Sequence, residues 1–326
     1  MRNSRNFNGR WMISMIALFV CVLALASSAR AADKIIRITM ARSVSCMPLW
    51  GIGPFAEKYG LHIEFIASAN NAEMQRNLQN GIEVGSLGFH NAAMMAEQNV
   101  TNVKIIAGIQ SGGQNLIVRK GVELNSWKDL EGKRIGQPPG SYASILFILA
   151  ARENGVDLSK VNFINTTPAG PAELQALKNG DLDGLVLWSP VIDRAVVDGY
   201  AYYPPCCDIG STKAFGGGNQ VLAANTDFLK DRATVLKFLK AYAESQEYYL
   251  KNPDKAVDFI SQYTGASKDV LNEAWKHGSW DLRFNLQNMI NVAKEGPKFG
   301  FTKSDMSDKV PQYIDMSFLS ESIGRP

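Results

Sequence analysis

The sequence is poor in histidine: His62, His90 and His277 are the only three among 326 residues. They lie far apart along the chain, and the H-E-x-x-H pair that binds zinc in many hydrolases does not occur. We therefore expect no metal site and no cofactor.

A cluster of basic residues is also missing. The whole chain has a formal net charge of +3, but residues 1–31 contain four of its 34 basic side chains and no acidic one. The rest has 30 basic and 31 acidic side chains, which gives a net charge of −1. Because nucleic-acid binding depends on a basic patch, we expect no nucleic-acid partner.

Long apolar runs are confined to the N-terminus. Arg2, Arg5 and Arg10 precede an almost wholly apolar stretch at residues 11–26, and small residues with an Ala-x-Ala site follow at 29–31. This order is typical of a cleavable signal peptide at residues 1–31, and a retained N-terminal anchor is the alternative. The pattern predicts export to the periplasm.

One later stretch, GQPPGSYASILFILAARENG, carries no charge at residues 136–151. Its apolar part is about half of the roughly 20 residues that cross a bilayer. The Pro-Pro-Gly-Ser before it is typical of a helix start, with Gly140 or Ser141 at the cap. We predict a buried helix rather than a membrane segment.

Cysteine is scarce as well, with four in the whole chain and three after residue 31. An odd number in an exported protein leaves at least one free thiol. The adjacent Cys206 and Cys207 are too close for ordinary disulfide geometry, so a bridge from Cys46 to either of them stays open.

From Lys34 onward, short apolar strands alternate with helical segments, first up to about residue 110 and again after Trp127. This alternation predicts an α/β fold with mostly parallel sheets. The two series echo each other at a spacing of 99 positions, where five residues correspond to five: Leu78, Asn80, Gly81, Gly85 and Phe89 to Leu177, Asn179, Gly180, Gly184 and Trp188. Two similar lobes are therefore expected.

Residues 227–297 have helical periodicity and leave no room for a third α/β lobe. We predict that this tail packs on the first lobe, so that the chain crosses between lobes twice, near 114–121 and 216–220. Lobe 1 would comprise residues 32–118 and 220–326, and lobe 2 residues 119–219.

Ligands of open parallel sheets bind beyond the carboxyl ends of the strands. Hydroxyls, amides, aromatic rings and one arginine follow the predicted strands, and such groups hold a small polar molecule in a cleft. The predicted ligand-binding residues are Arg42, Ser43, Ser45, Phe89, His90, Gln110, Ser111, Gly140, Ser141, Tyr142, Thr167, Trp188 and Asn219.

The candidate residues favour an organic anion. Arg42 has planar donors suited to a carboxylate or sulfonate, unless it faces solvent, and the helix start at Ser141 has unpaired N–H groups. Phe89, Tyr142, Trp188 and Trp50 would hold the organic part.

No pattern in the chain requires catalysis. Residues 51–56 match G-x-G-x-x-A, but Pro54 interrupts the motif and the following strand lacks the acid that would bind a ribose. A nucleophile–base pair of Cys207 and His90 is the alternative. We predict a binding protein rather than an enzyme.

The order of these features resembles a known family. The paired units, DGLVLWSPVIDRA at 183–195 and VLAANTDFLKDRATVLKFLKAYAESQEYYLKNPDKAV at 221–257 are similar to the nitrate/sulfonate/taurine group of periplasmic substrate-binding proteins. The resemblance implies the two-lobed type II periplasmic binding protein fold with two hinge crossovers. It also implies a monomer that captures a small-molecule ligand and delivers it to an ABC transporter permease with its ATPase.

Two features depart from that resemblance. His90 stands where a small residue or proline is expected, and the Cys206-Cys207 pair is unusual. An enzyme on the same fold, with pyrimidine-precursor chemistry at Cys and His, and a ligand-sensing input protein therefore stay open as alternatives.

Overall fold

The computed structural model describes residues 34–41, 43–166, 170–211 and 218–324, without the side chains of 211, 218 and 219. The predicted signal peptide lies outside these residues. Within them, no helix is long and apolar enough to span a bilayer.

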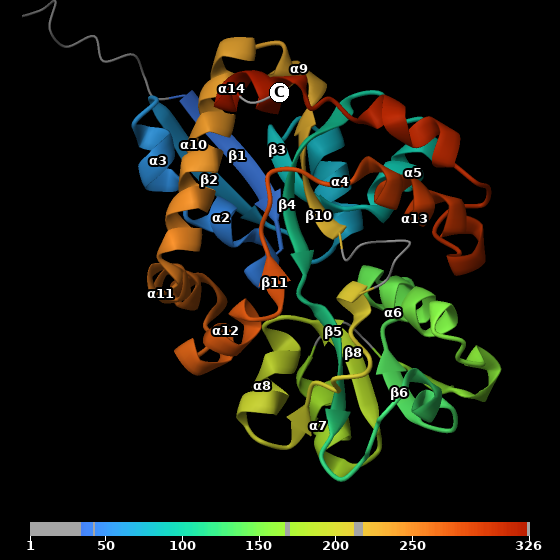
Figure 1. The fold of residues 1–326 in the computed structure, drawn as a ribbon. Coiled ribbons are helices and arrows are strands. Elements are labelled where there is room, and N and C mark those ends of the chain that lie inside the picture. The colour runs from blue at the N-terminus through green and yellow to red at the C-terminus, as the bar shows by residue number, and fades with distance from the viewer. Residues whose placement is uncertain (1–33, 42, 167–169, 212–217, 325–326) are drawn as a thin grey trace, which may run out of the picture.

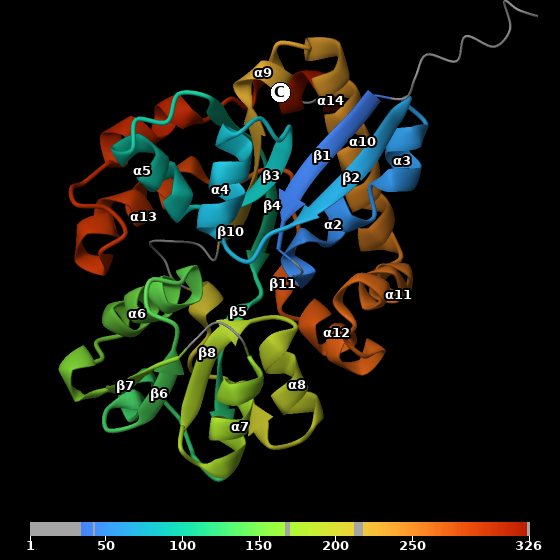
Figure 2. The same cartoon turned by 180° about the vertical axis from the view of Figure 1, so that it is seen from behind.

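The chain forms two sheets, one above the other in Figures 1 and 2. The first has the order β11-β4-β10-β3-β1-β2, with bounds β1 Lys34–Met40, β2 Leu61–Ala67, β3 Val84–Gly88, β4 Val103–Gly112, β10 Gly218–Asn225 and β11 Gly278–Ser279. The second has the order β7-β6-β8-β5-β9, with bounds β5 Gln114–Arg119, β6 Arg134–Gln137, β7 Asn162–Asn165, β8 Gly184–Trp188 and β9 Ala201–Tyr202.

Helices connect and cover the strands. The segments before β10 are η1 Val44–Cys46, α2 Met47–Trp50, α3 Gly53–Glu57, α4 Asn71–Gln79, α5 His90–Glu97, η2 Trp127–Leu130, α6 Tyr142–Glu153, η3 Leu158–Lys160, α7 Pro171–Asn179, α8 Val191–Val197 and η4 Ile209–Ser211. After β10 come α9 Thr226–Leu229, α10 Arg232–Lys251, α11 Pro253–Thr264, α12 Lys268–Trp275, α13 Leu286–Phe299, η5 Ser307–Tyr313 and α14 Ser317–Ile323.

Both sheets are mixed, which corrects the prediction of mostly parallel sheets. β10 is antiparallel to β3 and β4, and β5 is antiparallel to β8 and β9. The strands that helices connect within one sheet, such as β1, β2 and β3, are parallel as predicted. β5 and β10 instead enter from the other sheet, so no helical crossover imposes the parallel direction on them.

The chain first passes between the sheets at Gly113, before the predicted boundary after residue 118. β4 ends at Gly112 and β5 begins at Gln114. Gly112 and Gly113 have φ values of +75° and +73°, a region that side chains disfavour. A pair of glycines therefore lets the chain turn sharply from one sheet into the next. β10, the first described strand after η4, begins at Gly218 in the first sheet.

The C-terminal helices pack around the first sheet, as Figure 1 shows for α10 and α14. Tyr242 of α10 is fully buried, and its hydroxyl donates to the carbonyl of Gly108 in β4. The hydroxyl of Tyr313 likewise donates to the carbonyl of Met95 in α5. The tail also reaches the second sheet, because α12 contacts α8.

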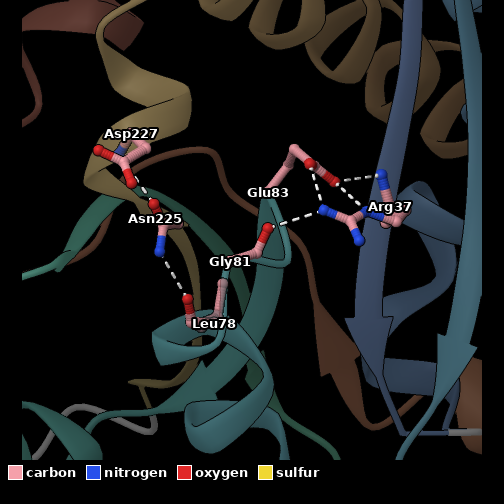
Figure 3. A network of polar contacts seen from close by, with 6 residues as sticks. All are labelled: Arg37, Leu78, Gly81, Glu83, Asn225 and Asp227. Carbon is pink, nitrogen blue, oxygen red and sulfur yellow. Dashed lines mark hydrogen bonds and ion pairs between the residues drawn. The ribbon is translucent and has the colours of Figure 1, made fainter.

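The sequence repeat corresponds to a repeated polar network, drawn for the first sheet in Figure 3. Arg37 donates to the Glu83 carboxylate through its backbone N, Nε and Nη2, and to the Gly81 carbonyl through Nη2. In the second sheet Arg134 makes the same four bonds to Asp183 and to the Gly180 carbonyl. Each network joins one strand to the turn before its neighbour.

We expect Asp183→Ala to lower the free energy of unfolding by about 2 kcal/mol, because charge-assisted hydrogen bonds are lost. The Asp183 side chain is 14% exposed and pairs with both Arg134 and Arg119. Urea unfolding of the variant measures the loss. Lys251→Ala is the matched control, since its ion pair with Glu247 is exposed and should contribute less than about 1 kcal/mol. Equal losses in the two variants would contradict the prediction.

Candidate ligand-binding site

A cavity of about 820 Å³ lies between the two sheets. Residues that follow β1, β2, β3 and β4 line it on one side, and residues that follow β6, β7 and β8 line it on the other. The carboxyl ends of strands in both sheets therefore meet at one space, as the strand-end argument predicts.

Helix α6 contributes to this space in the way that the uncharged stretch predicts. The helix begins at Tyr142, and its cap Ser141 accepts a hydrogen bond from the Ser144 amide at 3.2 Å. Nine of its twelve residues are buried, so the prediction of a buried helix is confirmed. Gly140, Ser141 and Tyr142 line the cavity at its N-terminal end.

Most of the predicted site residues with described side chains face the cavity. Its lining includes Ser43, Ser45, His90, Gln110, Gly140, Ser141, Tyr142 and Trp188. Arg42, Thr167 and the side chain of Asn219 lie outside the described residues.

Two aromatic candidates, Phe89 and Trp50, lie in the core and not at the cavity. Phe89 is 1% exposed and packs edge-on against Phe284, with ring centroids 5.7 Å apart. Because Phe89 and His90 project in different directions at the start of α5, the phenyl ring enters the core while the imidazole lines the cavity. Trp50 stacks on Tyr263 within the same core.

Ser111 lines a separate cavity of about 400 Å³. Gln110 and Ser111 are consecutive residues of β4, so their side chains leave opposite faces of the strand. Asp208, Lys276 and His277 share that second space with Ser111. Only Gln110 of this predicted pair belongs to the large cavity.

Sequence reasoning missed several lining residues. Asn70 and Asn71 lie three and four residues after the end of β2, and the strand-end argument applied to that strand would have found them. Gln114 also lines the cavity, as do Thr166 and Ser189, which belong to the predicted strand ends at 166–167 and 188–189. Phe301 reaches it from the C-terminal tail, and no local sequence signal marks it.

Four buried polar atoms of residues that line the cavity have no hydrogen-bond partner within the described part of the chain. They belong to residues of both sheets and their loops: His90 Nδ1, Gln110 Oε1, Gln114 Oε1 and Thr166 Oγ1. A buried polar group without a partner costs about 1–3 kcal/mol, and native proteins contain few of them. Their concentration around one cavity indicates a space built for a polar molecule.

His90 is uncharged at neutral pH. Burial lowers the pKa of its imidazole to about 4. The ring stacks on Tyr142, with centroids 5.1 Å apart and planes at 16°, and meets Phe301 edge-on at 5.9 Å. The three rings provide an apolar surface beside Nδ1 of His90.

Two helices have their N-termini at the cavity. Asn70 caps α4 by accepting a bond from the Glu73 amide at 2.9 Å, and Ser141 caps α6. The first residues of both helices line the space. The dipoles of the two helices favour an anionic group at this end. Among the described lining residues, none is an acid, lysine or arginine.

The thiols are poorly placed for catalysis. Cys46 lines the cavity, but burial raises its pKa and so disfavours the reactive thiolate. Cys206 and Cys207 are absent from the described lining, so Cys207 and His90 do not share this space. The three cysteines that the structure describes are free, and Cys46 is not bridged to the pair. No metal-binding cluster occurs within the described part of the chain.

The family model described as NMT1/THI5 like matches residues 54–256, more than half of the chain. The chain belongs to the NMT1/THI5-like family.

The taurine-binding periplasmic protein of Escherichia coli K12 is a curated relative of this chain. The two are 28% identical over 204 residues, and the match spans 61% of each chain. The chain therefore spans less than two thirds of the length of this relative. The match confirms the resemblance seen in the sequence.

Solved structures share the fold. The periplasmic aliphatic sulphonate binding protein SsuA from Escherichia coli superposes with a TM-score of 0.73 at 16% identity, over 86% of this chain and 92% of SsuA. The desulfurization enzyme DszB superposes with a TM-score of 0.68 at 14% identity, over 89% of this chain and 99% of DszB. These likenesses confirm the type II binding-protein fold, which binding proteins and an enzyme both use.

Proposed function

We propose that this protein is an extracytoplasmic solute-binding protein. It captures a small organic anion, such as a sulfonate or carboxylate, between its two lobes and delivers it to the permease of an ABC importer. The observation that carries the proposal is the set of four polar atoms around the 820 Å³ cavity that have no partner among the described residues. A ligand that bonds to them removes the cost of their burial.

The cavity fits an organic anion in two parts. The N-termini of α4 and α6 would hold the acidic group, and Arg42 would add a cation if it turns toward them. The stacked rings of His90 and Tyr142, with Trp188 and Phe301 near them, would hold the organic part. Since the cavity is large, bare nitrate would leave most of these groups without a contact.

Capture between lobes suits delivery to a membrane partner. The glycine pair at 112–113 lies in the passage between the sheets, where small backbone changes would move one lobe relative to the other. Closure around the ligand would create the surface that the permease recognises. The N-terminal pattern supports export to the periplasm through a cleaved signal peptide, and the protein would act there as a monomer without catalysis.

Ligand binding to residues 32–326 tests the proposal. Thermal unfolding is measured with taurine, benzenesulfonate, benzoate, nitrate and the neutral analogue benzamide. An organic anion at 100 times its Kd should stabilise the fold by about 2.7 kcal/mol, and NMR should recover it unchanged. Equal affinity for benzamide and benzoate would contradict the anionic ligand. Conversion of the ligand would contradict a binding protein.

Gln110→Leu should weaken the ligand found in that screen about 10- to 100-fold, because the 4% exposed amide loses its bond to the ligand. Calorimetric titration measures the Kd. Gln175→Leu is the control, since Gln175 lies on the exposed face of α7 and outside the cavity lining. An unchanged Kd in Gln110→Leu would exclude Gln110 from the site.

A further inference from the structure

Cys206 and Cys207 lie in a tight turn that plays no part in the proposed ligand site. The turn follows β9 and closes with a hydrogen bond from the Cys207 amide to the Pro204 carbonyl at 3.2 Å. Cys207 is 2% exposed, whereas Cys206 is half-buried at the edge of the core. One thiol is therefore within reach of solvent and the other is behind it.

The two sulfur atoms are held together. Their Sγ atoms are 2.6 Å apart, closer than two non-bonded sulfurs normally approach. The Cys206 thiol also donates to the Leu124 carbonyl at 3.5 Å. Tyr202 fixes that neighbouring segment, because its hydroxyl donates to the Val122 carbonyl at 2.8 Å and accepts from the Leu124 amide. The surrounding structure thus aligns the thiols before any reaction.

We propose that Cys206 and Cys207 are a redox modification site that forms a reversible disulfide between adjacent residues. The oxidant is a low-molecular-weight disulfide such as oxidised glutathione. The Cys206 thiolate attacks one sulfur of the oxidant, forms a mixed disulfide and releases one thiolate. The Cys207 sulfur then attacks Cys206 Sγ and releases the second. The two cysteine protons pass to these leaving groups, so one oxidant becomes two thiols.

The assignment of roles follows from burial. Burial raises the pKa of Cys207, so its thiolate is scarce and an outside oxidant cannot easily reach it. Cys206 is the accessible partner, and it makes the first attack. Once the mixed disulfide has formed, Cys207 is already beside the sulfur that it must attack.

The resulting bond is a labile one. Adjacent Cα atoms are about 3.8 Å apart, whereas disulfides usually join Cα atoms about 4.4–6.8 Å apart. The strain makes such a bond easier to reduce than a structural disulfide. The turn also leads into η4, which contacts β4, β5 and α6. The oxidation state is therefore set close to the passage from β4 to β5.

Oxidation of residues 32–326 with oxidised glutathione tests the proposal. The protein is then denatured, alkylated with N-ethylmaleimide and weighed intact. We expect one adduct, on Cys46, together with the loss of two hydrogens, and a peptide map that joins Cys206 to Cys207. Excess reduced glutathione should restore three adducts. Three adducts at every glutathione ratio, or a disulfide that includes Cys46, would overturn the proposal.

Single variants test the order of attack. Cys46→Ser should oxidise as the parent protein does. In Cys207→Ala the reaction should stop at a stable glutathione adduct on Cys206, whereas in Cys206→Ser the buried Cys207 should remain unmodified. Equally fast adduct formation in the last two variants would overturn the assignment of Cys206 as the attacking thiol.

Discussion

Acidification from pH 7 to pH 4.5 is expected to lower the free energy of unfolding by about 2–3 kcal/mol through His90 alone. Burial lowers the pKa of His90 from 6.5 to about 4 in the folded protein. The unfolded chain therefore takes up a proton at higher pH than the folded one. The stability is complete above pH 6.5 and is lost progressively as the pH falls toward 4.

Urea unfolding at the two pH values measures this effect, with His90→Gln as the control. Glutamine keeps a neutral polar side chain of similar size on the cavity wall but does not titrate. All other titrating groups are common to both proteins, so their contributions cancel in the comparison. The parent should lose about 2–3 kcal/mol more than the variant. Parallel losses would show that the imidazole is solvated in the folded state.

Phe147→Ala is expected to cost about 3–5 kcal/mol of unfolding free energy. Phe147 is fully buried in α6, with Trp127 at 6.3 Å and Phe163 at 6.4 Å between ring centroids. Its loss leaves a cavity beneath the helix that carries Ser141 and Tyr142. Ligand affinity should fall as well, because the N-terminus of α6 would no longer be held in one position.

Ile164→Ala in β7 is the matched control for this variant. Ile164 belongs to the same sheet region but is 42% exposed, so its removal leaves no buried cavity and should cost less than about 1 kcal/mol. Chemical unfolding of both variants gives the comparison. A loss below about 1.5 kcal/mol in Phe147→Ala would mean that the core closes around the missing ring.

Two features of the site show how far local sequence patterns reach. The start of α6 is encoded by Gly140 and Ser141, which precede an apolar run, and the helix begins there as predicted. Phe89 and His90 have no such local distinction. Which of the two side chains faces the cavity depends on the packing of α5 against α13 and on the contact of Phe89 with Phe284, nearly 200 residues later in the chain.

By itself, the sequence determined the α/β alternation, the repeated unit, the helix at Ser141 and the family, because these depend on residues close together in the chain. Only the tertiary structure decided that β5 and β10 run antiparallel to their neighbours. It alone also brought Gln114, Thr166, Ser189 and Phe301 to one cavity. The direction of a strand and the set of residues that line one cavity depend on contacts between distant segments. A short sequence pattern does not predict such contacts.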